Sequence, residues 1–138
     1  MKKEILTETI DGIEMPVIVL SIHFKWFQKI VTGEKTIELR KTIPHEGMPF
    51  KVIMLVTGYG AILGEFICRG YETHKDLSMF VKESCVSESE IRKYAAGNEV
   101  YGWKISDVKV YKGKIISNKS LGIKRSPQSW QYLRKVVE

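Results

Sequence analysis

The amino-acid sequence predicts an α+β protein, built as a small mixed β-barrel with short helices packed outside it. Predicted strands outnumber predicted helices, and they do not alternate as the regular βαβ units of a Rossmann sheet would. The chain has 138 residues, of which 43% are hydrophobic and 28% charged. Such a composition is typical of one globular domain with a core of its own.

The N-terminal end of the chain predicts paired strands. Residues 4–10 are followed by Asp11-Gly12, a dipeptide that favours two-residue hairpin turns. We therefore treat residues 1–16 as an N-terminal extension with a predicted β-hairpin, and residues 17–138 as the domain itself. Residues 17–23 are β-branched and almost continuously apolar, so we expect a central strand buried on both faces.

An amphipathic helix and a charged strand follow directly. Apolar residues four apart, such as Phe27 and Val31, predict one buried face of a helix over about residues 24–32. Gly33 is expected to end this helix, because a left-handed C-terminal residue is favoured without a β-carbon. In the strand that follows, side chains alternate, which predicts Glu38 and Arg40 on one face. This charged face is either a site or a solvated sheet surface.

The later elements are assigned from the same patterns. Strands are predicted over residues 50–57, 64–71, 100–105 and 108–111. Helices are predicted over residues 76–85 and from Ser87 to Gly97. Loops are predicted over residues 117–122 and 124–127, followed by an extended or helical segment around Trp130. Ser87 and Glu90 form a capping box, which predicts the start of the second of these helices. Trp26 and Trp103 are expected to fill the core.

Charge and cysteine content limit the classes of function. The net charge is +6, and residues 103–138 hold nine Lys/Arg against two Asp/Glu, a local excess of +7. Such a basic segment favours a polyanionic partner, nucleic acid first, although a solvated basic surface remains an equal alternative. The two cysteines, Cys68 and Cys85, are expected to be reduced. Without an apolar run long enough for a membrane span, and with acidic residues interrupting any signal peptide, we expect a cytoplasmic protein.

Common catalytic motifs are absent from the sequence. It contains neither a Gly-x-x-x-x-Gly-Lys-Ser/Thr phosphate loop nor a Gly-x-Ser-x-Gly elbow. His23, His45 and His74 lack metal-ligand spacing, and the cysteines lie too far apart for a zinc knuckle. We therefore expect neither a metal nor a cofactor.

The segment Gly33-x-Lys35-x-x-Glu38-x-Arg40 resembles the motif of the ASCH (activating signal cointegrator homology) domain of the PUA-like superfamily. Residues 102–108 and 121–130 are similar to the C-terminal half of bacterial and phage ASCH proteins, so the resemblance covers about residues 17–132. It implies a PUA-like β-barrel with flanking helices. It also implies a cleft beside the barrel that accepts RNA or a nucleotide-like ligand.

Carried over to this sequence, the ASCH motif assigns Lys35, Glu38 and Arg40 to the cleft, with Gly33 permitting the turn before them. Strand alternation alone places Lys35 opposite Glu38, and we expect the Gly33 turn to redirect it. One enzyme group of the superfamily removes the acetyl group of acetylcytidine with a threonine nucleophile at the position of Glu38. A carboxylate cannot replace that hydroxyl, so this activity is not expected here.

Further binding residues are predicted in loops. Tyr59, between two glycines, is a candidate for stacking on a base, and Lys124 and Arg125 are candidates for a basic extension of the cleft. The leading hypothesis is an ASCH module that binds RNA or a nucleotide. The alternatives are a hydrolase of modified nucleosides or RNA, with Lys35 and Glu38 as catalytic candidates, and a transcription-related adaptor. A plain salt bridge between Glu38 and Arg40 is the structural alternative.

Overall fold

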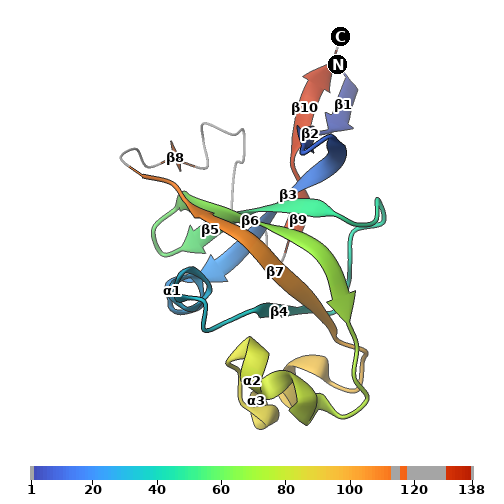
Figure 1. The fold of residues 1–138 in the computed structure, drawn as a ribbon, viewed down its shortest axis with the longest axis vertical. Coiled ribbons are helices and arrows are strands. Elements are labelled where there is room, and N and C mark those ends of the chain that lie inside the picture. The colour runs from blue at the N-terminus through green and yellow to red at the C-terminus, as the bar shows by residue number, and fades with distance from the viewer. Residues whose placement is uncertain (1, 113–115, 118–129, 138) are drawn as a thin grey trace.

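The computed structural model describes residues 2–112, 116–117 and 130–137 (Figure 1). Its strands are β1 (Lys2–Ile5), β2 (Thr7–Ile10), β3 (Ile13–His23), β4 (Ile37–Arg40), β5 (Phe50–Thr57), β6 (Ala61–Glu72), β7 (Tyr101–Val110), β8 (Ile116–Ser117), β9 (Trp130–Tyr132) and β10 (Arg134–Val137). Its helices are α1 (Phe24–Thr32), the 3-10 turn η1 (Leu77–Phe80), α2 (Val81–Ser84) and α3 (Glu88–Ala95). The predicted α+β class is confirmed.

The main sheet is curved but open. Its strands follow the order β2-β3-β5-β6-β7-β4, with β9 added to β3 and β8 added to β6. Strands β3 and β5 are parallel, and the other neighbours are antiparallel. Within the described residues no strand pairing joins β4 back to β3. The predicted barrel is therefore not closed, and the gap between β3 and β4 becomes important for the site.

The two central strands are buried on both faces, as predicted for residues 17–23. Alternate residues of β3 and β5, such as Leu20 and Met54, belong to the main core beneath α1. The residues between them, such as Val19 and Leu55, belong to a second apolar cluster on the other face. This double burial explains why both strands are almost continuously apolar rather than alternating.

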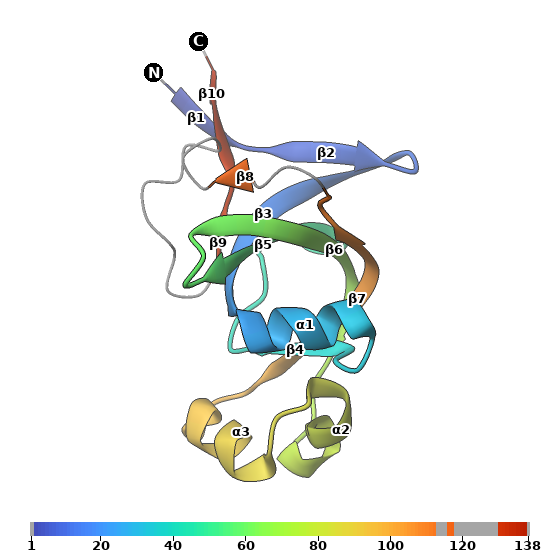
Figure 2. The same ribbon diagram turned by 90° about the vertical axis from the view of Figure 1, so that its left-hand side faces the viewer.

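Helix α1 lies across the sheet between the curved strands and the α2–α3 end of the molecule (Figure 2). Its bounds match the prediction, and Gly33 ends it in a left-handed conformation with φ 83°. The predicted pairing of Phe27 with Val31 is wrong for the second residue, because Val31 is 41% exposed. Phe27 and Ile30 form the buried stripe instead, which is narrower than expected.

The N-terminal segment forms two strands rather than one. Strands β2 and β3 make a hairpin around Asp11-Gly12, while β1 pairs with β10. Figures 1 and 2 place this β1–β10 ribbon and both chain ends opposite α2 and α3. Because β3 begins at Ile13, the division at residue 16 falls inside a strand. Treating residues 1–16 as a separate extension stays a prediction.

A partly buried charge network attaches β2 to the second face of the sheet. The Lys51 Nζ atom lies 2.6 Å from Glu8 Oε2 and 3.2 Å from Glu65 Oε1. The hydroxyl of Tyr111 donates a hydrogen bond of 2.9 Å to Glu65. Tyr111 also packs against the second apolar cluster, and the Lys51–Glu8 ion pair connects β2 to β5.

Several helices and strands begin or end at other residues than the sequence predicts. Residues 100–105 and 108–111, predicted as two strands, form the single strand β7, with Asp107 at φ 52° where its register to β6 is irregular. The Ser87 cap of α3 is present, but the helix ends on a left-handed Ala96 before Gly97. The segment around Trp130 is a strand. The predicted loop over 124–127 lies outside the described residues.

A close backbone approach at Gly64 yields a stability prediction. A β-carbon at this position would lie 2.7 Å from the backbone oxygen of Lys109 on the neighbouring strand. We expect Gly64→Ala to lower the free energy of unfolding by about 1–3 kcal/mol, because the two strands must separate. Gly70 lies on the same strand with nothing within 4 Å, so Gly70→Ala is the matched control. Equal urea midpoints for the two variants would contradict the prediction.

Candidate functional site

A cleft of about 410 Å³ opens where the sheet fails to close. Its walls come from the end of β3, the start of α1, strand β4 and helix α3. The floor carries the charged residues Lys35, Glu38 and Arg40. The three residues of the predicted motif therefore converge on one cavity, and their role in binding stays a prediction.

Strand β4 supplies Glu38 and Arg40 through its alternation. Ile37 and Leu39 pack into an apolar cluster with residues of η1 and α3, which directs Glu38 and Arg40 the other way. Glu38 Oε2 accepts a hydrogen bond of 2.8 Å from Arg40 Nη2. The salt bridge between Glu38 and Arg40 is therefore present, and both of its residues line the cleft.

Lys35 is redirected into the cleft by the turn after α1. Its backbone N–H donates to the Lys29 carbonyl at the end of that helix, at 3.0 Å. The side chain is almost fully buried, at 1% exposure. Its Nζ atom donates 2.7 Å to the Ser84 carbonyl and lies 3.3 Å from Glu38 Oε1. The ammonium group also lies 5.0 Å from the centre of the Trp26 ring.

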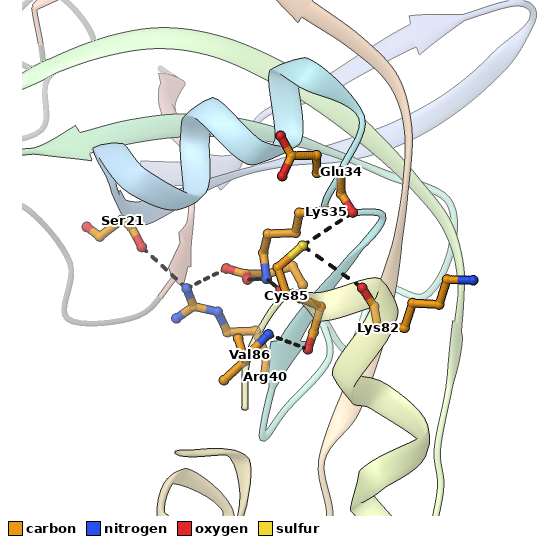
Figure 3. A network of polar contacts seen from close by, with 9 residues as sticks. Ser21, Glu34, Lys35, Arg40, Lys82, Cys85 and Val86 are labelled. Carbon is orange, nitrogen blue, oxygen red and sulfur yellow. Dashed lines mark hydrogen bonds and ion pairs between the residues drawn. The ribbon is translucent and has the colours of Figure 1, made fainter. Parts of the chain in front are cut away.

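Arg40 spans the opening of the sheet. Its Nη2 atom lies 3.4 Å from the carbonyl oxygen of Ser21 on β3, across the gap that no strand pairing bridges in the described residues. Figure 3 shows this side chain reaching Ser21, with Lys35 on the other side of the network. A side chain thus replaces backbone pairing at this position, which leaves room for the cleft.

The electrostatic state of Glu38 follows from its two cationic neighbours. Burial by itself raises the pKa of this carboxyl group, but the charges of Arg40 and then Lys35, and their hydrogen bonds, outweigh it. The pKa is consequently lowered from its ordinary value of 4.5. Glu38 is an ionised hydrogen-bond acceptor at neutral pH.

Two aromatic side chains form walls of the cleft. Trp26 comes from α1, and Tyr94 comes from α3. The prediction that Trp26 fills the core is only partly right, because it packs against the main core from a half-buried position while one part of it lines the cleft. Trp103 is fully buried, as predicted. Burial raises the pKa of the Tyr94 hydroxyl, so this group is neutral and able to donate.

Tyr59, another of the predicted binding residues, does not join this group. Tyr59 is 61% exposed and does not line the cleft, and its ring centre lies 5.2 Å from that of Phe24. Lys124 and Arg125 lie outside the described residues. Both cysteines are free, as expected, and burial raises the pKa of the Cys68 thiol to about 11.

Sequence reasoning missed the contribution of the helical end of the molecule. Tyr94 lines the cleft from α3, and the Ser84 carbonyl that holds Lys35 ends α2. The only sequence signal was the spacing of Ile91 and Tyr94 on one helix face, which does not reveal what that face covers. Backbone acceptors such as the Ser21 and Ser84 carbonyls leave no trace in the sequence.

The described part of the chain holds no group of three His, Cys, Asp or Glu residues placed to bind a metal ion. Across the same residues, no helix combines the length and apolarity that a membrane crossing requires.

Solved structures with a similar fold were found for this chain. No family model matches the chain, and no curated protein matches it. The crystal structure of ASCH from Zymomonas mobilis superposes with a TM-score of 0.72 and 22% identity, covering 86% of this chain and 88% of that one. Two single-substitution variants of that protein give TM-scores of 0.71 and 0.74 at the same identity and the same share of this chain, covering 91% and 89% of theirs.

This chain has the ASCH fold. The fold that the sequence resemblance implied is thereby supported over 86% of the chain. At 22% identity the likeness establishes the fold and leaves the ligand of this chain to be inferred from its own cleft.

Proposed function

We propose that this ASCH domain binds RNA or a nucleotide in the cleft at the open edge of its sheet. The observation that carries the proposal is the chain of ion pairs Lys35–Glu38–Arg40, largely buried in a cavity with aromatic walls. Buried ion pairs contribute little net stability compared with apolar residues of the same size. Charged groups gathered in a cleft are instead a frequent property of functional sites.

The chemistry of the cleft matches a nucleobase. Its volume of about 410 Å³ is within the range of small-ligand sites. Trp26 and Tyr94 offer aromatic surfaces on which a base stacks. Glu38 accepts hydrogen bonds, which suits an exocyclic amine, and Arg40 donates them, which suits a base carbonyl or ring nitrogen. The fold shared with ASCH of Zymomonas mobilis is compatible with this proposal.

Replacing Trp26 by alanine tests the position of the base. We expect Trp26→Ala to weaken the binding of a short single-stranded RNA by about 1–3 kcal/mol, the usual contribution of one stacked base. Fluorescence anisotropy of a labelled oligonucleotide measures the change. Tyr59→Ala is the control, because Tyr59 is an exposed aromatic residue outside the cleft. Equal losses for the two variants would place the base outside the cleft.

A hydrolase remains the second candidate, supported by one observation. The Glu38 carboxylate lies 3.3 Å from the Lys35 ammonium in the cleft, an arrangement that suits a carboxylate that orients an attacking water beside a cation that stabilises developing negative charge. Incubation with acylated nucleosides and with labelled RNA, followed by mass spectrometry, separates catalysis from binding. Turnover that disappears in Glu38→Gln while the RNA is still bound would favour the hydrolase.

A further inference from the structure

We propose that Lys25 and Lys41 contact the phosphates on the two sides of a single unstacked base held in the cleft, so that the ligand is a single-stranded RNA. This inference rests on the proposed function and assigns the phosphate contacts to two residues outside the ASCH motif.

The two cations of the cleft floor are already engaged within the protein. Lys35 donates to Ser84 and pairs with Glu38, and its side chain is almost inaccessible. Arg40 pairs with the same carboxylate and contacts the Ser21 carbonyl. Between them the two cations share the charge of Glu38, and Glu90 adds a second carboxylate to the cleft lining. A phosphate dianion or diester would have to displace these contacts, whereas a neutral base would not.

Lys25 lies beside the wall that α1 provides. Its side chain is exposed, and its Nζ atom lies over the Trp26 ring, 4.8 Å from the ring centre. It also lines a shallow groove of about 280 Å³ along α1. The first turn of this helix carries no acidic residue, so its positive N-terminal end adds to the charge of Lys25. A phosphate attached to a base on Trp26 would meet favourable charge here.

Lys41 has the same relation to the opposite wall. It is exposed directly after β4, and its Nζ atom lies 4.8 Å from the centre of the Tyr94 ring on α3. Within residues 2–112, 116–117 and 130–137, neither Lys25 nor Lys41 forms a salt bridge with a carboxylate. Each aromatic wall therefore carries one lysine whose charge is not neutralised by a neighbouring acid.

This arrangement selects a single strand over a duplex. A base can enter the cleft only when it leaves its stack, and unstacking is least costly in single-stranded nucleic acid. The aromatic wall then supplies stacking, while the lysine beside each wall supplies a point charge for the neighbouring phosphate. Contacts with the cleft floor should make the affinity depend on the identity of the base. The phosphate contacts of the two lysines should make the affinity depend on the salt concentration.

The salt dependence of binding tests this division. Anisotropy titrations of a labelled single-stranded RNA, from about 50 to about 200 mM salt, give the slope of log K against log salt. We expect Lys25→Gln and Lys41→Gln each to reduce the magnitude of that slope by about 0.7, and the double variant by about 1.4. Lys3→Gln is the control of equal charge change, because Lys3 lies on β1 at the far end of the molecule. It should leave the slope unchanged.

The outcomes separate this inference from the function on which it rests. Unchanged slopes in the two lysine variants, with tight binding that Trp26→Ala weakens, would overturn the phosphate assignment and leave the cleft proposal standing. Reduced slopes with no effect of Trp26→Ala would support the lysine contacts and overturn the cleft as the base site. Equal affinity for a duplex of the same sequence would overturn the inserted base. Tighter binding of single-stranded DNA than of RNA would overturn RNA as the ligand.

Discussion

Replacing Glu38 by glutamine is expected to lower the free energy of unfolding by about 3–5 kcal/mol, because it leaves two buried cations without their shared anion. Lys35 and Arg40 both contact this carboxylate, at 3.3 Å and 2.8 Å, and the carboxylate itself is buried. Glutamine keeps the shape of the side chain, so the loss measures charge rather than volume. Urea unfolding near neutral pH gives the value.

The same carboxylate predicts how stability depends on pH. The pKa of Glu38 is lowered in the folded protein, so its contribution is fully present above the unfolded value of 4.5. That contribution is lost as the pH falls through the folded pKa, below 4.5. Wild-type stability should therefore fall in acid by more than that of Glu38→Gln, and the difference between the two proteins should shrink as the pH decreases.

Two further variants make the Glu38 prediction specific. Glu90 also lines the cleft, but its side chain is exposed, so Glu90→Gln should change stability by no more than about 0.5 kcal/mol. Adding Lys35→Met to Glu38→Gln removes one of the unpaired buried cations and should recover part of the loss. A Glu38→Gln variant as stable as Glu90→Gln would show that the cleft charges are solvated rather than buried.

The parts of this fold that the sequence predicts are those with a local cause. Helix α1 follows from apolar spacing and from Gly33, whose left-handed conformation needs no β-carbon. The start of α3 follows from Ser87, whose side chain accepts a hydrogen bond from the Glu90 N–H. Strand β4 follows from alternation, which also placed Glu38 and Arg40 on the same face.

What the sequence could not predict depends on contacts between distant segments. The barrel was expected to close, yet β3 and β4 are bridged by the Arg40 side chain instead of by strand pairing in the described residues. Trp26 and Trp103 look alike in the sequence, but one lines the cleft and the other is buried. The Lys35 ammonium, which lies beside Glu38, also donates to the Ser84 carbonyl, forty-nine residues away in the sequence.

Replacing Trp103 by alanine is expected to lower the free energy of unfolding by about 3–5 kcal/mol, a large part of the stability of a domain of this size. Trp103 lies directly opposite Glu38 in the β4–β7 ladder. Its ring packs edge-on against Phe50, with centres 5.0 Å apart, and its Nε1 atom donates 3.2 Å to the Thr42 carbonyl. Alanine would leave both a cavity and an unsatisfied acceptor behind the cleft floor.

Comparing Trp103→Ala with Trp26→Ala distinguishes a residue that stabilises the fold behind the cleft from a residue that contacts the ligand. Trp103 is fully buried and does not line the cleft, so its loss should weaken RNA binding through unfolding. Binding should recover when a lower temperature restores folding. Trp26 forms a wall of the cleft, so its loss should weaken binding while the protein stays folded.

Val108→Ala changes a half-exposed position on the same strand as Trp103 and is the control. It should change the free energy of unfolding by no more than about 0.5 kcal/mol. Circular dichroism and anisotropy on the same samples measure both quantities. If Trp103→Ala were as stable as Val108→Ala, the core would not be what holds β4 and its charged residues in place.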